Sequence, residues 1–257
     1  MSRLDRLPAP LHAALGQRSL LKVIAGLTNF DAVGVARIAR AAGRGGADLI
    51  DIACDPGLVR TAAASGLPIC VSAVDPELFP AAVEAGAALV EIGNYDAFYP
   101  QGRIFDADEV LDLTRRSRAL LGEVVLSVTV PHVLPLDQQE QLALDLVAAG
   151  ADLIQTEGGT SARPFSAGSL GLIEKAAPTL AAAHGISRAL AAAGLAAPVL
   201  CASGLSAVSV PMAIAAGASG VGVGSAVNRL DDELAMVAVV RGLREALGEG
   251  VAAPSLL

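Results

Sequence analysis

The sequence predicts an α/β protein that folds as one (β/α)8 TIM barrel, and three observations favour this fold. The chain has 257 residues, close to the roughly 250 that a barrel of eight strands and eight helices needs. A phrase of a small residue, a glycine and an alanine, followed by a short apolar run, occurs four times, at Gly45, Ala85, Ala149 and Ala216. Four further apolar runs lie before or between these phrases, so that eight short runs alternate with segments of helical length.

The repeated phrase explains how each helix ends and each strand begins. The glycine suits the left-handed conformation that terminates a helix, and the apolar run after it is too short for a helix and suits a strand buried on both faces. A doubly wound open sheet is the alternative, but no GxGxxG motif follows the first strand. Strands are expected at residues 21–26, 49–53, 69–73, 89–93, 124–130, 153–156, 199–202 and 220–224.

The barrel is expected to account for almost the whole chain. Residues 1–19 are assigned to a lead-in segment with a short helix, residues 20–250 to the barrel and residues 251–257 to a C-terminal tail. The lead-in lacks the long apolar stretch of a secretory signal, and no run reaches the roughly 18 apolar residues of a membrane span. These features predict a soluble cytoplasmic protein.

Composition excludes some classes of partner. The net charge of −8 gives an acidic surface that repels nucleic acid and anionic lipid, so neither nucleic acid nor membrane is expected as a partner, whereas a homo-oligomer stays open. The three cysteines, Cys54, Cys70 and Cys201, are odd in number and widely spaced. This spacing fits a reducing compartment without structural zinc, and it predicts buried, inert thiols.

Alternation along the strands predicts a polar barrel interior. With Ile50 and Ile52 facing the helices, Asp51 faces inward. Buried charges cost several kcal/mol unless they are paired, so such an interior indicates either catalytic groups or a buried ion-pair network. The other inward residues by the same rule are Lys22, Cys70, Ser72, Glu91, Ser127, Thr129, Gln155, Glu157, Cys201, Ser203 and Gly222.

Lysine is rare in this chain. Only Lys22 and Lys175 are lysines among 18 cationic residues, so a lysine kept in a strand calls for a specific explanation. Lys22 could form a Schiff base with a carbonyl group or stabilise an enolate. Alternatively it lies too deep to reach a substrate and pairs with Asp51 or Glu91.

Proton transfer is assigned to interior carboxylates. Asp51, Glu91 and Glu157 are the candidates. His132 follows the fifth strand and is either a further acid or base or a bystander on the rim. No metal cluster is evident, although the three carboxylates could hold one Mg²⁺.

Two glycine–serine segments predict a phosphate site at the ends of the last two strands. Ser203 and Gly204 follow the seventh strand, and Gly224 and Ser225 follow the eighth. Glycines allow backbone N–H groups to approach an anion, and a helix that begins at Ser225 would direct its positive end toward it. Barrel enzymes often bind phosphate here, although simple turns also need glycine. Asn228 and Arg229 could assist, and a weaker third turn contains Gly158 and Gly159.

Aromatic residues cluster in the loop after the fourth strand. Four of the seven, Tyr95, Phe98, Tyr99 and Phe105, lie there. Such a loop suggests a lid over a ligand; a small satellite core or a subunit contact is the alternative. The residues predicted to serve the lid are Asn94, Tyr95, Tyr99 and Arg103.

Six motifs resemble a known family. They are KVIAGLTNFD (22–31), DIACDP (51–56), EIGNYD (91–96), SVTVPH (127–132), QTEGGT (155–160) and CASGLS (201–206). They look like the hypothetical chloroplast reading frame twenty-three family of cyanobacteria and algal plastids, over about residues 20 to 245. The resemblance implies the barrel fold and a location in a cyanobacterium or the plastid stroma, and it leaves the reaction open.

The last two strands are more distantly similar to two groups of phosphate-binding barrels. One group contains epimerases, decarboxylases and thiazole synthase, and the other contains flavin mononucleotide enzymes such as nitronate monooxygenases. Residues 150–159 are similar to the sixth-strand segment of the flavin group, but Thr160 stands where that group has its catalytic histidine.

Three functions follow from these features. The first is a lyase, isomerase or epimerase that acts on a small phosphorylated metabolite and requires no cofactor. The second is a flavin mononucleotide (FMN)-dependent oxidoreductase, yellow as purified. The third is a non-catalytic barrel that senses a metabolite or binds a partner, with a structural interior. Fold alone does not choose among them.

Overall fold

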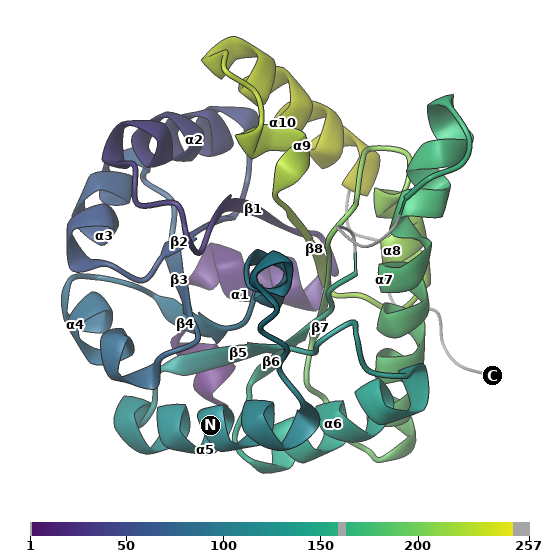
Figure 1. Cartoon of the computed structure of the whole chain (residues 1–257). Helices are drawn as coiled ribbons and strands as arrows, with labels where there is room; N and C mark the ends of the chain where they lie inside the picture. The colour runs from purple at the N-terminus through teal and green to yellow at the C-terminus, as the bar shows by residue number, and fades with distance from the viewer. Residues whose placement is uncertain (1, 159–162, 249–257) are drawn as a thin grey trace.

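Eight parallel strands close into a barrel and follow one another in sequence order around it (Figure 1). The computed structural model describes residues 2–158 and 163–248. The predicted fold class is confirmed, and each predicted strand agrees with the observed one to within one residue at each end. The strands are β1 (Leu20–Gly26), β2 (Leu49–Ala53), β3 (Ile69–Ala73), β4 (Leu89–Ile92), β5 (Val125–Thr129), β6 (Leu153–Gln155), β7 (Val199–Ala202) and β8 (Gly220–Val223).

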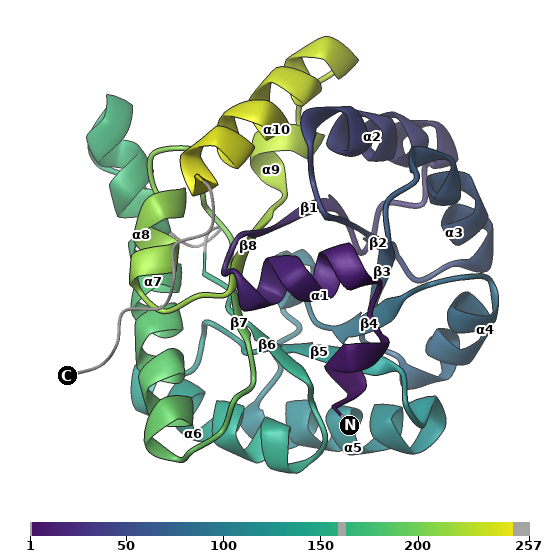
Figure 2. The same cartoon turned by 180° about the vertical axis from the view of Figure 1, so that it is seen from behind.

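Helices surround the barrel and cover its outer face (Figures 1 and 2). None of the described helices is both long and apolar enough to cross a membrane. The helices are α1 (Ala9–Gly16), α2 (Ala32–Gly45), α3 (Pro56–Ala62), α4 (Phe79–Glu84), α5 (Ala107–Leu121), α6 (Leu136–Ala148), α7 (Gly168–Ala192), α8 (Val210–Ala215), α9 (Ser225–Asn228) and α10 (Glu233–Leu247).

The repeated glycine–alanine phrase ends four helices in the same way. Its glycines, Gly46, Gly86, Gly150 and Gly217, have φ values of 88°, 116°, 105° and 116°. In each copy the N–H of the next alanine donates to the carbonyl oxygen five residues earlier, as Ala47 does to Ala42. This is the hydrogen bond of a Schellman motif. The motif turns the chain from the end of each helix directly into the next strand.

The lead-in segment closes the mouth of the barrel at which the strands begin. Figure 2 shows α1 lying across this mouth. Leu11 and Leu15 of α1 pack in one buried cluster with Leu20, Leu49 and the other first inward residues of the strands. The floor of the barrel is therefore apolar, and water cannot enter from this side.

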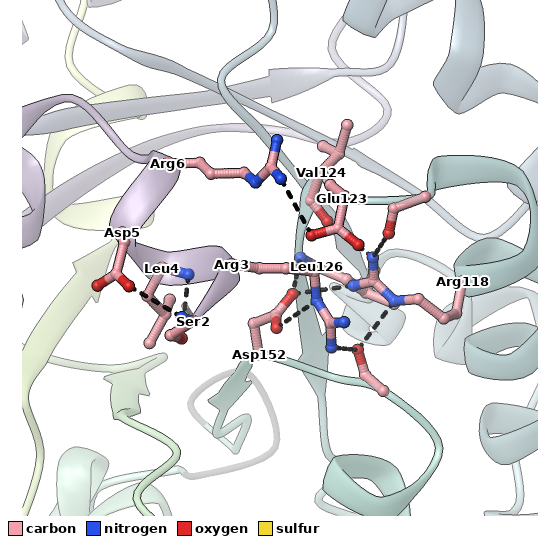
Figure 3. Close-up of polar contacts among 12 residues, drawn as sticks. Ser2, Arg3, Leu4, Asp5, Arg6, Arg118, Glu123, Val124, Leu126 and Asp152 are labelled. Atoms are coloured by element: carbon pink, nitrogen blue, oxygen red, sulfur yellow. Dashed lines mark hydrogen bonds and ion pairs between the residues drawn. The ribbon is translucent and has the colours of Figure 1, made fainter.

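A charged cluster fastens the segment before α1 to the barrel (Figure 3). Arg3 Nε donates to Asp152 Oδ1 over 2.8 Å, and Arg118 Nη2 donates to Asp152 Oδ2 over 2.8 Å. The backbone N–H of Leu126 also donates to Asp152 Oδ2, over 2.9 Å. Asp152 therefore joins the N-terminal segment, α5 and the start of β5 at one carboxylate.

The three cysteines are free and buried, as predicted. Burial raises the pKa of Cys54 to about 12 and that of Cys201 to about 11, so neither forms a thiolate at neutral pH. The predicted inward orientation of Cys201 is wrong. Leu200 packs in the inner cluster instead, while Cys201 lies outside the barrel wall, with its sulfur 3.7 Å from the hydroxyl of Thr179 on α7.

The Asp152→Asn variant should lose about 2 kcal/mol of unfolding free energy, because the half-buried guanidinium of Arg118 loses its charged partner. Urea denaturation measures this loss. The matched control is Glu123→Gln, which breaks the exposed Arg6–Glu123 pair of the same region and should change stability by less than about 0.5 kcal/mol. Equal effects of the two variants would contradict the anchoring role of Asp152.

Candidate functional site

Lys22 lies at the centre of a buried polar layer above the apolar floor. Its Nζ is 2.7 Å from Glu91 Oε2 and 3.2 Å from Asp51 Oδ2, and it donates to Gln155 Oε1 over 2.9 Å. The predicted inward orientation of these four side chains is confirmed: each is at most 1% exposed. The layer is an ion pair shared between one cation and two carboxylates, completed by an amide.

Neighbouring strands satisfy the remaining acceptors of the two carboxylates. Ser72 donates to Asp51 Oδ1 over 2.6 Å, and Ser127 donates to Glu91 Oε2 over 2.8 Å. Gln155 Nε2 donates to Glu91 Oε1 over 2.7 Å. Asp51 Oδ2 accepts no hydrogen bond among the described residues and is compensated by its ion pair with Lys22. Pairing and hydrogen bonding of this kind are what allow charges to be buried in a barrel.

Lys22 is held protonated in this network. Burial alone lowers the pKa of Lys22, but the carboxylates of Asp51 and Glu91 outweigh it and raise the pKa above its ordinary value of 10.5. The ammonium group therefore stays charged throughout the neutral range. A cavity opens where the strands end, and Lys22 is not among the residues that line it. Lys22, which the sequence offered as a Schiff-base lysine, is thus a buried ammonium group. Its contacts are those of the alternative in which Lys22 only pairs with carboxylates.

A cavity of about 650 Å³ opens at the mouth where the strands end. Two of the predicted phosphate-binding segments line it: Ser203 and Gly204 after β7, and Gly224 and Ser225 at the start of α9. Ser203 and Gly204 have φ values of 79° and 71°, so consecutive residues adopt the left-handed conformation that bends the chain sharply around the cavity. The backbones of the two loops therefore face the same space.

Three cationic side chains surround this side of the cavity. They are Arg163, which precedes α7, Lys175 of α7, and Arg229, which follows α9. Within the described residues, none of the three forms an ion pair or donates a hydrogen bond. Sequence reasoning named Arg229 as an assistant and missed Arg163 and Lys175. The rarity of lysine was a usable signal, and it applied to Lys175 as much as to Lys22.

The opposite side of the cavity is acidic. Asp96 lines the cavity and lies next to His132 and Glu157. His132 Nδ1 is 3.1 Å from Glu157 Oε2 and 3.5 Å from Asp96 Oδ1. Tyr99 donates its hydroxyl to Glu157 Oε2 over 2.8 Å, and its ring packs edge-on against that of His132 at 5.1 Å. We call Asp96, Tyr99, His132 and Glu157 the mouth cluster.

The carboxylates of the mouth cluster favour the charged form of His132. Burial alone lowers the pKa of His132, but Glu157 and then Asp96 outweigh it and raise the pKa above its ordinary value of 6.5. Burial, together with Glu157, raises the pKa of Tyr99, so that Tyr99 stays a hydrogen-bond donor. Sequence reasoning named Tyr99, His132 and Glu157 separately and did not name Asp96 as a site residue.

The aromatic loop divides between the cavity and a satellite core. Tyr95 is fully buried, and its ring lies 4.6 Å from that of Phe105. Phe98 completes the packing at 5.6 Å from Phe105. Arg103 lies over the Phe105 ring and pairs with Glu109, away from the cavity lining. The observed contacts of Tyr95 and Arg103 are those of the satellite-core alternative. A contact of either residue with a ligand stays a prediction.

Asn94 connects the cavity with the buried polar layer. It lines the cavity and has a φ of 64°, which is uncommon for a residue with a side chain. Its Nδ2 lies 3.4 Å from Glu91 Oε1 and 3.5 Å from Ser72 Oγ. The left-handed backbone thus places an amide between the charges below and the cavity above.

The third predicted phosphate turn is only partly described. Gly158 has a φ of 150°, and an added Cβ there would lie 3.2 Å from Pro178 of α7. The lack of a side chain at Gly158 therefore permits close packing of the β6 end against α7. Gly159 and Thr160 lie outside the described residues.

Fold and site together define a TIM barrel with a two-sided cavity at the carboxyl ends of its strands, the position of the active site in barrel enzymes. The chain belongs to the family described as "Protein of unknown function (DUF561)", whose model matches residues 7–251. It is 43% identical over 225 residues to the "Uncharacterized protein ycf23" of Cyanophora paradoxa, covering 87% of this chain and 90% of that one. The sequence resemblance is thereby confirmed.

Solved structures share the fold at low sequence identity. A thiamine phosphate pyrophosphorylase from Pyrococcus furiosus superposes with a TM-score of 0.57 at 17% identity, covering 93% of this chain and all of that one. A putative deoxyribose-phosphate aldolase from Toxoplasma gondii gives a TM-score of 0.60 at 15% identity, covering 95% and 96%. At these identities the similarity establishes the barrel fold.

The Lys22→Met variant should lose about 3–5 kcal/mol of unfolding free energy, because two buried carboxylates lose their cation. In the triple variant Lys22→Met/Asp51→Asn/Glu91→Gln no charge stays unpaired, and most of this loss should be recovered. Chemical denaturation of both variants measures the difference. A Lys22→Met protein as stable as the parent would contradict the buried ion pair, as would a triple variant less stable than the single one.

Proposed function

We propose that the protein is an enzyme that binds a small phosphorylated metabolite, with the phosphate group between the β7 and β8 ends. The observation that carries this proposal is that Arg163, Lys175 and Arg229 line the same cavity as two glycine-containing loops. The whole chain carries a net charge of −8, so three cations that have no acidic partner among the described residues and line one cavity favour an anionic ligand. Guanidinium and ammonium groups both bind phosphate well.

The chemistry of the opposite side supports a lyase, isomerase or epimerase. A ligand anchored at β7 and β8 would extend toward Asn94 and Asp96, behind which lie His132 and Glu157. These groups can move a proton or stabilise the charge that develops on a carbonyl oxygen. The cavity of about 650 Å³ is in the size range of small-molecule sites.

Proteins with similar folds support the same class of ligand. The names of two of them, thiamine phosphate pyrophosphorylase and putative deoxyribose-phosphate aldolase, refer to phosphorylated compounds. Two more are described as a 3-hexulose-6-phosphate synthase and an orotidine 5′-phosphate decarboxylase. Lys22 takes no part in the proposed reaction, because it lies in the buried layer below the cavity and not in its lining.

The bound ligand distinguishes the three functions predicted from the sequence. The protein is purified without removal of tightly bound molecules, its visible spectrum is recorded, and small molecules are released for mass spectrometry. A colourless protein that releases a phosphorylated carbonyl compound supports the proposal and supplies a substrate for turnover assays. A yellow protein that releases FMN replaces the proposal with an oxidoreductase. A released phosphorylated ligand that is never turned over would make the protein a sensor.

Neutralising Lys175 or Arg229 should weaken phosphate binding. Lys175→Met and Arg229→Met should each reduce the affinity for glycerol 3-phosphate by about tenfold, since a hydrogen bond from a charged group contributes about 1.5–3 kcal/mol. Calorimetric titration measures the affinity, with glycerol as the ligand lacking phosphate. The control is Arg241→Met, which removes an exposed arginine of α10 outside the cavity. Unchanged affinity in both cavity variants would refute the proposed anion site.

A further inference from the structure

The mouth cluster gathers three groups that ligate metal ions, from the ends of three adjacent strands. Asp96 follows β4, His132 follows β5 and Glu157 follows β6. Each offers one ligand atom, and the three atoms lie within 4.8 Å of one another. Because β4, β5 and β6 are neighbours in the barrel wall, the ends of rigid elements and not one flexible loop bring these groups together.

The spacing of the ligand atoms matches that of a first-row transition metal site. Bonds of about 2.0–2.2 Å from zinc to nitrogen and oxygen place neighbouring ligand atoms of a tetrahedral site about 3.3–3.6 Å apart. The observed separations from His132 Nδ1 are 3.1 Å to Glu157 Oε2 and 3.5 Å to Asp96 Oδ1. The third separation, between the carboxylates of Asp96 and Glu157, is at most 4.8 Å. The two separations from His132 therefore suit an ion already, and the two carboxylates are close enough to approach it from either side of the imidazole.

Groups behind the ligand atoms already hold Glu157 in place. The backbone N–H of Asp96 donates to Glu157 Oε1 over 2.9 Å, and the Tyr99 hydroxyl donates to Glu157 Oε2 over 2.8 Å. Hydrogen bonds of this kind orient a carboxylate ligand and are a regular part of metal sites. Glu157 is only 3% exposed, and a carboxylate buried this deeply, beside a second carboxylate, is stabilised by a cation close to it. Protonated His132 can supply that charge, and a bound metal ion would supply it in place of the proton.

We propose that Asp96, His132 and Glu157 bind one divalent transition-metal ion, of the type of Zn²⁺ or Mn²⁺. The imidazole favours these ions over Mg²⁺, which prefers oxygen ligands alone. Three protein ligands would leave a position open, as in catalytic metal sites, and one of the three, Asp96, lines the cavity. In the sequence no metal cluster was evident, and Asp51, Glu91 and Glu157 were the set that could hold one Mg²⁺. Asp51 and Glu91 instead surround Lys22.

The role of this ion rests on the proposed function, whereas its binding does not. In turnover, the ion would polarise a carbonyl or hydroxyl oxygen of the ligand whose phosphate group is bound at β7 and β8. The acidic side of the cavity would then act through a Lewis acid, and not through His132 as a free acid or base. Ion binding itself can be measured with no phosphorylated ligand present.

The experiment is a calorimetric titration of Zn²⁺ into the full chain after treatment with a chelator. The chain has three histidines, so the parent for the test is His12→Gln/His184→Gln, in which His132 alone remains. This parent should bind one ion per chain. Adding His132→Gln, Glu157→Gln or Asp96→Asn should weaken binding by about 100-fold, 10–100-fold being the usual cost of removing even an outer-shell partner. Substituting Co²⁺ should give visible absorption bands that these variants lose.

The outcomes separate this inference from the phosphate proposal. A parent that binds no ion at one equivalent, or one that keeps its affinity after His132→Gln, overturns the metal site and leaves the phosphate proposal standing. The control for folding is thermal unfolding without added metal: each ligand variant should unfold in one cooperative transition, as the His12→Gln/His184→Gln parent does. Loss of ion binding together with a retained unfolding transition is the result expected.

Discussion

The burial of Lys22 is the constraint on which the rest of the molecule depends. An ammonium group at 1% exposure must be matched by carboxylates within about 3 Å. Asp51 and Glu91 supply them from β2 and β4, the two neighbours of β3. The carboxylates in turn need donors, and Ser72, Ser127 and Gln155 supply these from β3, β5 and β6. One charge thus fixes the register of side chains from six of the eight strands, between an apolar floor below and the cavity above. Asn94 connects this network to the cavity, because its side-chain amide donates to Glu91 and Asn94 itself lines the cavity.

Most of the fold could be predicted because its signals are local. The Schellman hydrogen bond of each repeat joins residues only five apart. One short sequence motif therefore specifies both the end of a helix and the start of the next strand. The orientation of strand side chains could be predicted where apolar and charged residues alternate, as around Asp51. It was mispredicted at Cys201, because Leu200, Cys201 and Ala202 are all apolar enough to face either side. Packing of Leu200 on the floor and of Cys201 on α7 decides the orientation, and neither contact is local.

The same distinction between local signals and non-local contacts decides which site residues could be predicted. Ser203, Gly204, Gly224 and Ser225 could be identified because each immediately follows a strand, and strand ends converge in any barrel. Lys175 reaches the cavity only because of how α7 packs. Thr179, one turn after Lys175, is hydrogen-bonded over 2.6 Å to Thr156, which directly follows β6, and donates to the carbonyl oxygen of Ala202 on β7. These contacts hold the face of α7 that carries Lys175 against the β6 and β7 ends. No pattern in the sequence of α7 reveals this, since the partners are 23 residues away on either side.

The cavity is polarised, and the polarity has a structural origin. Its cations are Arg163 after β6, Lys175 of α7 and Arg229 after α9, while its carboxylate, Asp96, follows β4, across the barrel from β8. Asp96 lies with Glu157, His132 and Tyr99, while Lys175 and Arg229 form no ion pair within the described residues. A ligand with an anionic group at one end and a polar oxygen at the other can satisfy both sides in one orientation only. In the reverse orientation its anion would face two carboxylates, and like charges in a partly enclosed cavity repel strongly. Orientation would therefore be set by electrostatics before any hydrogen bond at the reacting end forms.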